Sequence, residues 1–253
     1  MDAVVLDHVD KAYTTYGTDI VLTGETRPSR TRQVLRDLSL TISAGEITVI
    51  VGRSGCGKST LLKLLAGTET PDTGTIRIPE GWHSAMLSPD PYVITWTSVQ
   101  RNVAMACGVG KTPEERYERA SEFVRLVGLE DYADLTPAEL STGMKQRLGL
   151  ARVLAGQAEL LLMDEPFASL DFLTRAELQS QLLAIQEKLP RTIVLVTHQL
   201  EEALLLGRRI IVMHPDSTIC EFDLTDLPYP RDLDDPTLRR LKEAITDQCR
   251  YTA

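Results

Sequence analysis

Residues 52–60 have the types and spacing that bind phosphate groups. They read Gly-Arg-Ser-Gly-Cys-Gly-Lys-Ser-Thr, which matches the pattern G-x-x-x-x-G-K-[ST], and the apolar run 47–51 leads directly into them. A strand that ends in such a loop turns backbone N–H groups toward an anion, and a following helix faces the same point with its positive end. The four fixed positions would coincide by chance on the order of one time in a hundred chains of this length. The sequence therefore predicts a nucleoside triphosphate site formed by Gly52, Arg53, Ser54, Gly55, Cys56, Gly57, Lys58, Ser59 and Thr60.

Two loop residues and two acids could carry the chemistry of hydrolysis. We expect Lys58 to bridge the β- and γ-phosphates, and the hydroxyl of Ser59 to be a ligand for Mg²⁺. The apolar run 160–163 ends in Asp164 and Glu165. Asp164 could reach Mg²⁺ through water, and Glu165 could orient and deprotonate the attacking water. The alternative is that the two acids only cap the next helix, but the phosphate loop upstream favours the catalytic interpretation.

A histidine follows a second apolar strand at the same predicted sheet edge. His198 comes just after residues 192–196. There it could donate a hydrogen bond to the γ-phosphate and respond to its presence. A lone histidine is more often a structural residue, and only its place after a strand favours the functional role.

The elements that position these residues alternate between strands and helices. Strands are predicted at 4–6 and 34–42, separated by a polar stretch, and the apolar strands near the site alternate with helices such as 174–189. This pattern is typical of an α/β fold with a parallel sheet covered on both faces. Thr112 and Ser141 each precede a predicted helix. We expect one domain over 1–253, with a core at 1–85 and 155–215, a helical insert at 86–154 and a C-terminal tail at 216–253.

Composition and charge exclude several classes of function. The net charge of −9 argues against nucleic-acid binding, which depends on dense Lys and Arg. No apolar stretch approaches the roughly 18–20 residues needed to cross a bilayer, so membrane contact would come through a partner. The four cysteines lack the spacing of a zinc site, and disulfides are not expected. We expect a cytoplasmic protein, because no secretory signal is visible at the N-terminus.

Two further motifs resemble those of ATP-binding cassette (ABC) ATPases. Residues 140–144, Leu-Ser-Thr-Gly-Met, resemble the signature loop, whose usual form is Leu-Ser-Gly-Gly-Gln, and residues 169–171, Ser-Leu-Asp, resemble the D-loop. With the phosphate loop, the acid pair and the histidine in the family's order, the resemblance covers nearly the whole chain. Within the family, the chain is similar to ATPases of nitrate, sulfonate, taurine and bicarbonate importers.

The resemblance implies a fold, a partner and further site residues. The fold is a P-loop NTPase (RecA-like) core with an N-terminal antiparallel β subdomain and an inserted α-helical subdomain. The family forms a head-to-tail dimer in which ATP lies between one chain's phosphate loop and the other chain's signature, here Ser141 and Gly143. Asp171 belongs to the same nucleotide site. The family also stacks an aromatic residue on adenine, which is Tyr13 here, although Tyr16 is close enough to compete and a surface tyrosine is the plain alternative.

Gln199 and Arg208 differ from the residues usual in the importer subfamily, and three further departures from the family pattern bear on function. Pro89 stands where the family has a glutamine that touches Mg²⁺ or water, and proline has no side-chain donor or acceptor. In the signature, Thr142 replaces a glycine and Met144 a glutamine. We therefore hypothesise slower hydrolysis or altered coupling, and a heterodimer is an alternative to the simpler homodimer.

The sequence thus predicts the ATP-hydrolysing subunit of a membrane importer for a small oxyanion or sulfonate-like solute. Its partners would be a second ATPase subunit, transmembrane permease subunits and, indirectly, a solute-binding protein, with the chain peripheral on the inner face of the cell membrane. One alternative is a weakly hydrolysing subunit that mainly docks the complex. A less favoured alternative is a soluble ABC ATPase of DNA repair or translation.

Overall fold

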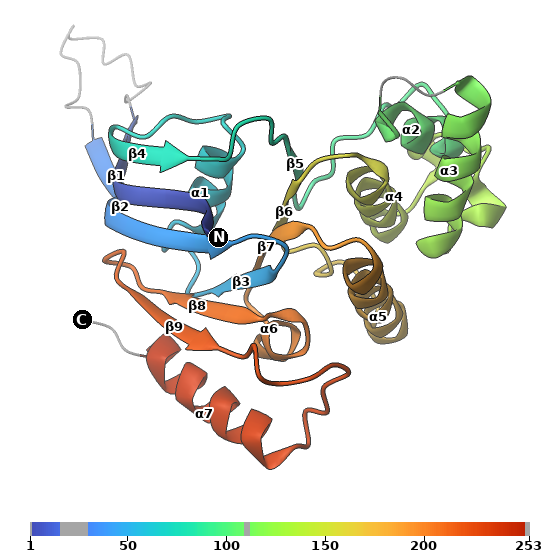
Figure 1. Ribbon diagram of the computed structural model, residues 1–253. Helices are drawn as coiled ribbons and strands as arrows, with labels where there is room; N and C mark the ends of the chain where they lie inside the picture. The colour runs from blue at the N-terminus through green and yellow to red at the C-terminus, as the bar shows by residue number, and fades with distance from the viewer. Residues whose placement is uncertain (1, 16–29, 109–111, 251–253) are drawn as a thin grey trace, which may run out of the picture.

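Two β-sheets and a set of helices make up the fold (Figure 1). The computed structural model describes residues 2–15, 30–108 and 112–250, so Tyr16 lies outside the described residues. A six-stranded sheet runs in the order β5-β6-β7-β3-β8-β9, and a three-stranded sheet in the order β2-β1-β4. This confirms the predicted α/β fold.

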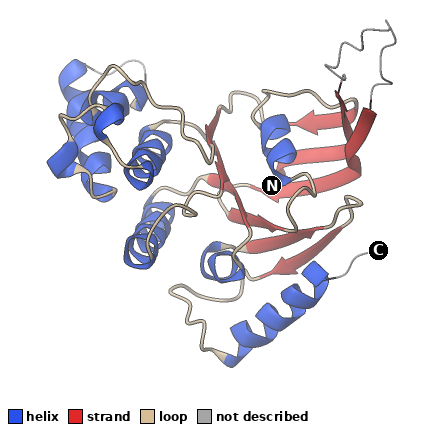
Figure 2. Cartoon of the chain, turned by 180° about the vertical axis from the view of Figure 1, so that it is seen from behind, coloured by secondary structure: helices blue, strands red, loops and turns tan. Residues whose placement is uncertain are grey.

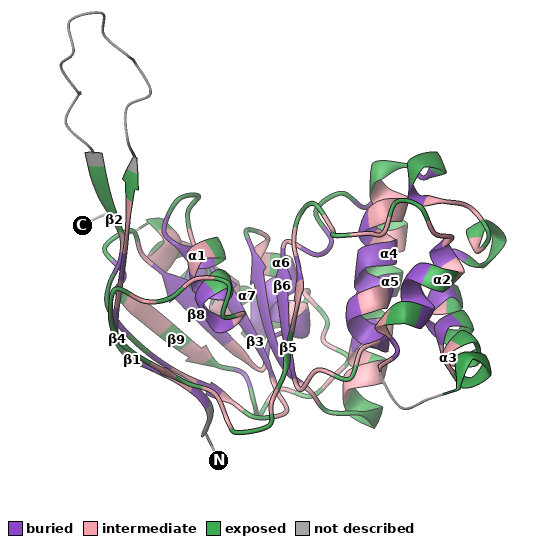
Figure 3. Ribbon diagram, turned by 90° about the horizontal axis from the view of Figure 1, so that it is seen from above, coloured by how far each residue is buried: buried purple, intermediate pink, exposed green. Residues whose placement is uncertain are grey.

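The six-stranded sheet forms the centre of the molecule. Its strands are β5 (Ser84–Leu87), β6 (Leu160–Asp164), β7 (Thr192–Thr197), β3 (Ile47–Val51), β8 (Arg209–Met213) and β9 (Ile219–Asp223). The first five are parallel, and every residue of β3, β6 and β7 is buried (Figure 3). These strands read as uninterrupted apolar runs because both faces of the sheet are covered.

Alternate residues of each central strand enter two different cores. Val49 and Val51 pack into a core formed with the helices, whereas Ile50 packs into a core shared with α1 and the antiparallel sheet. Helix α1 (Lys58–Leu65) lies between the two sheets, and helices α5 (Phe172–Lys188) and α6 (Leu200–Leu206) cover the opposite face (Figure 1). The phosphate loop joins β3 to α1, so the predicted site lies at the carboxyl ends of the parallel strands.

The antiparallel sheet is longer than predicted. Strands β1 (Asp2–Thr15) and β2 (Arg30–Ser43) pair over almost their whole length, and β4 (Thr73–Arg77) pairs with β1. The predicted strands at 4–6 and 34–42 cover most of the apolar parts. Among the described residues of β1 and β2 outside those ranges only Val9 and Lys11 are buried, so the outer parts show no continuous hydrophobic pattern.

Helices α2 (Val99–Ala106), α3 (Pro113–Leu126) and α4 (Thr142–Ala155) gather to one side of the sheets (Figure 2). Short 3₁₀ turns at Glu130–Tyr132 and Pro137–Glu139 join α3 to α4. Helix α3 begins with a capping box, in which the Thr112 hydroxyl accepts from the Glu115 N–H and the Glu115 carboxylate accepts from the Thr112 N–H. Because residues 84–87 form β5 in the central sheet, the helical region starts after residue 87 rather than at 86.

The C-terminal segment belongs to the core, which differs from the predicted tail. Strand β9 pairs antiparallel with β8, and helix α7 (Pro236–Arg250) packs on α6 and β8 with Leu238 and Ile245 buried. The edge of β8 would otherwise present unpaired backbone groups, and β9 satisfies them. Among the described residues, no helix is long and apolar enough to cross a membrane.

Candidate nucleotide site

The phosphate loop is held between a buried strand and the first helix. Strand β3 ends at Val51, and α1 begins at Lys58. Gly57 has a φ of 106°, and a Cβ there would lie 2.6 Å from Leu35 Cδ2. A Cβ at Gly52 would lie 2.4 Å from the carbonyl oxygen of Met213. Both glycines are required, because a side chain at either position would strain the loop or collide with its surroundings.

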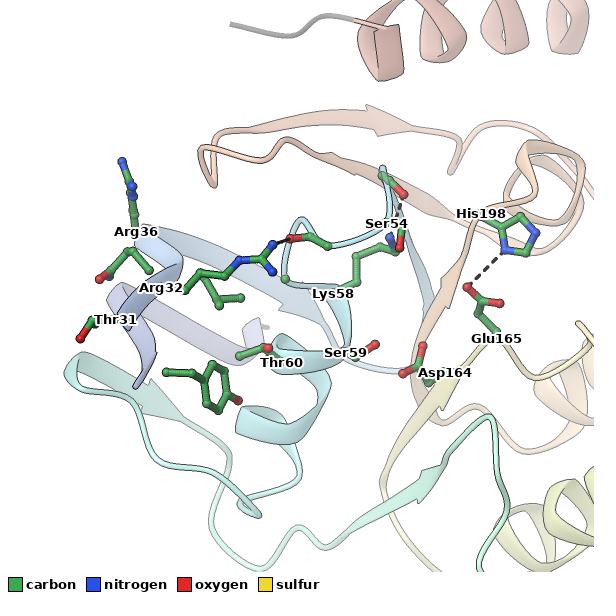
Figure 4. A pocket seen from close by; sticks show the side chains of 16 residues that line it. Thr31, Arg32, Arg36, Ser54, Lys58, Ser59, Thr60, Asp164, Glu165 and His198 are labelled. Atoms are coloured by element: carbon green, nitrogen blue, oxygen red, sulfur yellow. Dashed lines mark hydrogen bonds and ion pairs between the residues drawn. The ribbon is translucent and has the colours of Figure 1, made fainter. Parts of the chain in front are cut away.

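A cavity of about 1220 Å³ opens over this loop (Figure 4). Most of the predicted loop residues line it, together with Asp164, Glu165, His198 and Tyr13. Two predicted loop residues do not. The side chain of Cys56 is buried in the core with α1, and Arg53 is exposed outside the lining. The lining residues from the prediction are Tyr13, Gly52, Ser54, Gly55, Gly57, Lys58, Ser59, Thr60, Asp164, Glu165 and His198.

Lys58 places its ammonium group at the centre of the loop. Its Nζ donates to the carbonyl oxygens of Gly52, at 2.7 Å, and Arg53, at 3.1 Å, and only 8% of the residue is exposed. A cation held by two loop carbonyls at the start of a helix is suited to binding phosphate oxygens.

Asp164 and Ser59 supply oxygen atoms at the floor of the cavity. Asp164 is 5% exposed, and burial raises its pKa, an effect that a hydrogen bond with Ser59 partly offsets. A buried carboxylate beside a hydroxyl is a donor set that fits Mg²⁺, which commonly uses one or two protein oxygens together with water and phosphate. No group of three His, Cys, Asp or Glu side chains in the described part of the chain could hold a metal by itself. That result is compatible with an ion shared with the nucleotide.

Glu165 and His198 form a pair at the end of the cavity beyond Lys58 (Figure 4). Nδ1 of His198 lies 3.2 Å from Oε1 of Glu165. Glu165 has a φ of 49°, which is uncommon for a residue other than glycine, and its N–H donates to the carbonyl of Val196 at 2.9 Å. This bond to β7 fixes the carboxylate near the histidine that follows the same strand. Strained backbone of this kind is typical of functional sites.

The structure does not bring Ser141, Gly143 or Asp171 into the cavity. Ser141 caps α4, where its hydroxyl accepts from the N–H of Met144 at 3.3 Å. Asp171 caps α5, and its hydrogen bonds with Thr174 lower its pKa. Gly143 lies beside the predicted D-loop, since a Cβ there would be 3.3 Å from the carbonyl oxygen of Ser169. The signature and the D-loop thus form a separate surface on the same chain.

Sequence reasoning missed one side of the cavity. Five residues near the start of β2 line it opposite α1, and they are Thr31, Arg32, Gln33, Val34 and Arg36. The polar stretch gave no pattern that assigns them to a site. The usable signal was the presence of four arginines, at positions 27, 30, 32 and 36, ahead of the strand that leads into the phosphate loop. The assembled cavity, with a phosphate loop, a buried carboxylate and a Glu–His pair, defines a P-loop ATPase.

Comparison with known proteins narrows this class. Residues 35–168 match the family described as ABC transporter. The chain is 44% identical over 203 residues to the taurine import ATP-binding protein TauB of Pseudomonas aeruginosa (strain UCBPP-PA14), covering 77% of this chain and 76% of that protein. It is 39% identical over 241 residues to the bicarbonate transport ATP-binding protein CmpC of Synechocystis sp. (strain ATCC 27184 / PCC 6803 / Kazusa), covering 90% of this chain and 34% of CmpC.

A solved structure gives the same result for the fold. The dimeric, post-hydrolysis state of the ATP-binding cassette MJ0796, bound to ADP and Pi, matches with a TM-score of 0.75 and 27% identity. The match covers 87% of this chain and 98% of that one. The chain belongs to the ABC transporter family, and it is an ATP-binding ATPase of that family.

Proposed function

We propose that the chain is the ATP-hydrolysing subunit of a membrane importer for a small sulfonate or oxyanion. One observation carries the proposal. Residues from the phosphate loop, the end of β6 and the end of β7 line a single cavity, with the Glu165–His198 pair at one end of it. The solute class is supported by the similarity to TauB and CmpC, whose names refer to taurine, a sulfonate, and to bicarbonate.

Several residues of the cavity have roles in the proposed reaction. The loop amides and Lys58 hold the β- and γ-phosphates, so that the terminal phosphorus faces Glu165. Glu165 takes a proton from the attacking water, and His198 donates a hydrogen bond to the γ-phosphate as negative charge develops there. Mg²⁺ bound by Ser59 and Asp164 would neutralise charge on the phosphate oxygens. Tyr13 would stack on the adenine.

The site is completed by a second subunit in this proposal. Ser141 and Gly143 lie outside the cavity of their own chain, yet Ser141 precedes a helix N-terminus, which suits an anion. The dimeric state of the MJ0796 cassette supports the pairing of two such chains. ATP held between the phosphate loop of one subunit and Ser141 of the other would close the pair, and hydrolysis would loosen it.

A permease is the proposed route to the membrane. Tyr92 is 92% exposed and Trp96 82% exposed in the segment between β5 and α2. Tyr92 also lines a cavity of about 310 Å³ together with residues of β5 and α4, including Leu87 and Gly149. Large exposed aromatic groups beside a hollow are typical of a protein contact. Docking there would hold the chain on the inner face of the membrane, and the permease would link it to a solute-binding protein.

Phosphate release by Glu165→Gln tests the proposal. We expect hydrolysis to fall by about 10²–10⁴-fold, because the variant lacks the general base, while ATP binding measured by calorimetry is retained. Glu177→Gln, at an exposed position on α5, is the matched control and should hydrolyse ATP like the wild type. The assay is run with the membrane partner that co-purifies with the chain. Unchanged turnover in Glu165→Gln would refute the catalytic assignment.

One observation favours the alternative of a weakly hydrolysing docking subunit. Pro89 is exposed and neither it nor Ser88 or Asp90 lines the nucleotide cavity, so no side chain there replaces the family's glutamine. The same assay separates the two functions. A docking subunit would show wild-type turnover no higher than that of Glu165→Gln, even with its membrane partner present.

A further inference from the structure

Arg32 and Tyr13 stand side by side at the nucleotide cavity. They are directly paired residues of the antiparallel strands β2 and β1, and both line the cavity. Directly paired residues of an antiparallel sheet have Cβ atoms about 4.5–5.5 Å apart on the same face. The guanidinium of Arg32 is thus a neighbour of the ring proposed to stack on adenine.

The guanidinium also reaches the phosphate loop. Nη2 of Arg32 donates to the carbonyl oxygen of Gly55 at 3.3 Å, and Figure 4 shows the side chain extending from β2 toward the loop and Lys58. A guanidinium carries five N–H donors in a planar fork, so a bond to one carbonyl leaves donors that can bind phosphate oxygens. Arg32 therefore spans the distance between Tyr13 and the loop.

A nucleotide bound with its base at Tyr13 and its outer phosphates at Lys58 must place its sugar and α-phosphate between them. We propose that Arg32 binds the α-phosphate of the nucleotide and so determines the affinity for ATP and ADP alike. The inference rests on the proposed placement of adenine on Tyr13 and of the β- and γ-phosphates on Lys58. Arg32 thereby adds a nucleotide-binding residue from the antiparallel sheet to those of the phosphate loop.

A second arginine of β2 provides a contrast. Arg36 also lines the cavity, but in Figure 4 it lies farther from Lys58 than Arg32 does, and its side chain extends away from the loop. Its backbone N–H donates to the hydroxyl of Ser217 at 2.9 Å, which anchors this part of β2. The position of Arg32, rather than basic charge in general, therefore carries the inference.

Calorimetric titration of Arg32→Ala with ATP and with ADP tests the proposal. Both nucleotides contain an α-phosphate, so we expect both dissociation constants to rise by a similar factor of about 10–100. Arg77→Ala removes the same charge from β4, outside the cavity, and should bind both nucleotides like the wild type.

Several outcomes would overturn the proposal. They are unchanged affinities in Arg32→Ala, a loss confined to ATP, or a fall in kcat at saturating ATP with unchanged affinity, which would indicate only a loop-positioning role. A loss of nucleotide affinity in Arg36→Ala with none in Arg32→Ala would show that Arg36, and not Arg32, makes the contact. Arg32→Gln, which keeps donors without the charge, serves if the alanine variant does not fold, and the same equal weakening is expected. If the wild type itself binds neither nucleotide, the proposed function fails, and not merely this inference.

Discussion

The ring and the hydroxyl of Tyr13 lie in different environments. Its ring lines the nucleotide cavity, and the ammonium of Lys11 lies 5.5 Å from the ring centroid. Its hydroxyl is buried and has no hydrogen-bond partner within the described residues. A buried hydroxyl without a partner loses its hydration and regains nothing. The sequence pointed to this residue through a family resemblance, but only the structure separates the roles of ring and hydroxyl.

Replacing Tyr13 tests this separation. Tyr13→Phe keeps the ring and removes the hydroxyl, so ATP affinity should be unchanged and stability equal or higher by up to about 1 kcal/mol. Tyr13→Ala should weaken ATP binding by about 5–150-fold, because stacking on a base contributes about 1–3 kcal/mol. Calorimetry and urea unfolding measure the two effects. Equal binding by the Phe and Ala variants would contradict the stacking role.

Glu202 is a buried carboxylate next to the site. It is 3% exposed, and its Oε2 accepts from the hydroxyl of Thr197 at 2.6 Å. Burial raises its pKa, with the Thr197 bond and the charge of Arg175 acting in the opposite direction. The folded chain therefore holds a proton on Glu202 more tightly than the unfolded chain does. Stability from this group is present below the unfolded pKa and is lost as pH rises through the folded value.

Glu202→Gln should remove this pH dependence. The variant has no proton to release, so its free energy of unfolding should fall less than that of the wild type as pH rises from about 4 toward neutrality. Urea unfolding at a series of pH values gives the comparison, with Glu243→Gln on α7 as an exposed control. Parallel curves for Glu202→Gln and the wild type would show that Glu202 titrates normally.

Among the elements, the central strands β3, β6 and β7 were predictable, whereas β5 and the C-terminal elements were not. Strands β3, β6 and β7 are continuous apolar runs, so the sequence predicts their burial. Strand β9 is only partly buried, and prolines at 228, 230 and 236 suggested an irregular tail. Hydrogen bonds from one arginine help to hold this region to the core, and they leave no hydrophobic periodicity in the sequence. Arg231 donates from Nη1 to the carbonyls of Leu204 and Gly207 and from Nη2 to those of Leu224 and Leu227.

Arg231→Lys tests how much these four hydrogen bonds stabilise the fold. A lysine keeps the charge but cannot reproduce the planar fork, so buried carbonyls lose their donors. We expect the free energy of unfolding to fall by about 2–3 kcal/mol. Arg240→Lys, at an exposed position on α7, should stay within about 0.5 kcal/mol of the wild type. Urea denaturation followed by circular dichroism gives the free energies of unfolding. An equally mild effect at both positions would show that the hydrogen bonds of Arg231 do not stabilise the fold.

For the whole molecule, the order of motifs predicted the fold and the class of site, but not the contacts between distant segments. Arg32 was missed because its place beside Tyr13 depends on the register of β1 and β2, which the polar ends of those strands do not encode. The positions of Ser141 and Gly143 were expected only through the family resemblance. Their separation from the cavity depends on how the helical region sits beside the sheets.

The exposed aromatic residues allow a test of assembly. Arg152 donates to the carbonyl of Tyr92, which fixes the backbone of a segment whose side chains remain open. Replacing Tyr92 and Trp96 together by serine should leave ATP binding intact but reduce partner-stimulated hydrolysis at least about tenfold, because interface aromatics often contribute 2 kcal/mol or more. Tyr132→Ser, an exposed tyrosine outside the segment between β5 and α2, is the control. Normal stimulation of the double variant would place the membrane contact elsewhere.

The separation of Ser141 from its own nucleotide cavity has a genetic consequence. In a homodimer of the proposed kind, a chain altered at Lys58 still offers an intact signature, and a chain altered at Ser141 still offers an intact loop. Two such chains expressed in one cell would combine into pairs with one complete centre and one that is doubly damaged. Inactive alleles of these two types should therefore complement each other, whereas two alleles of the same type should not.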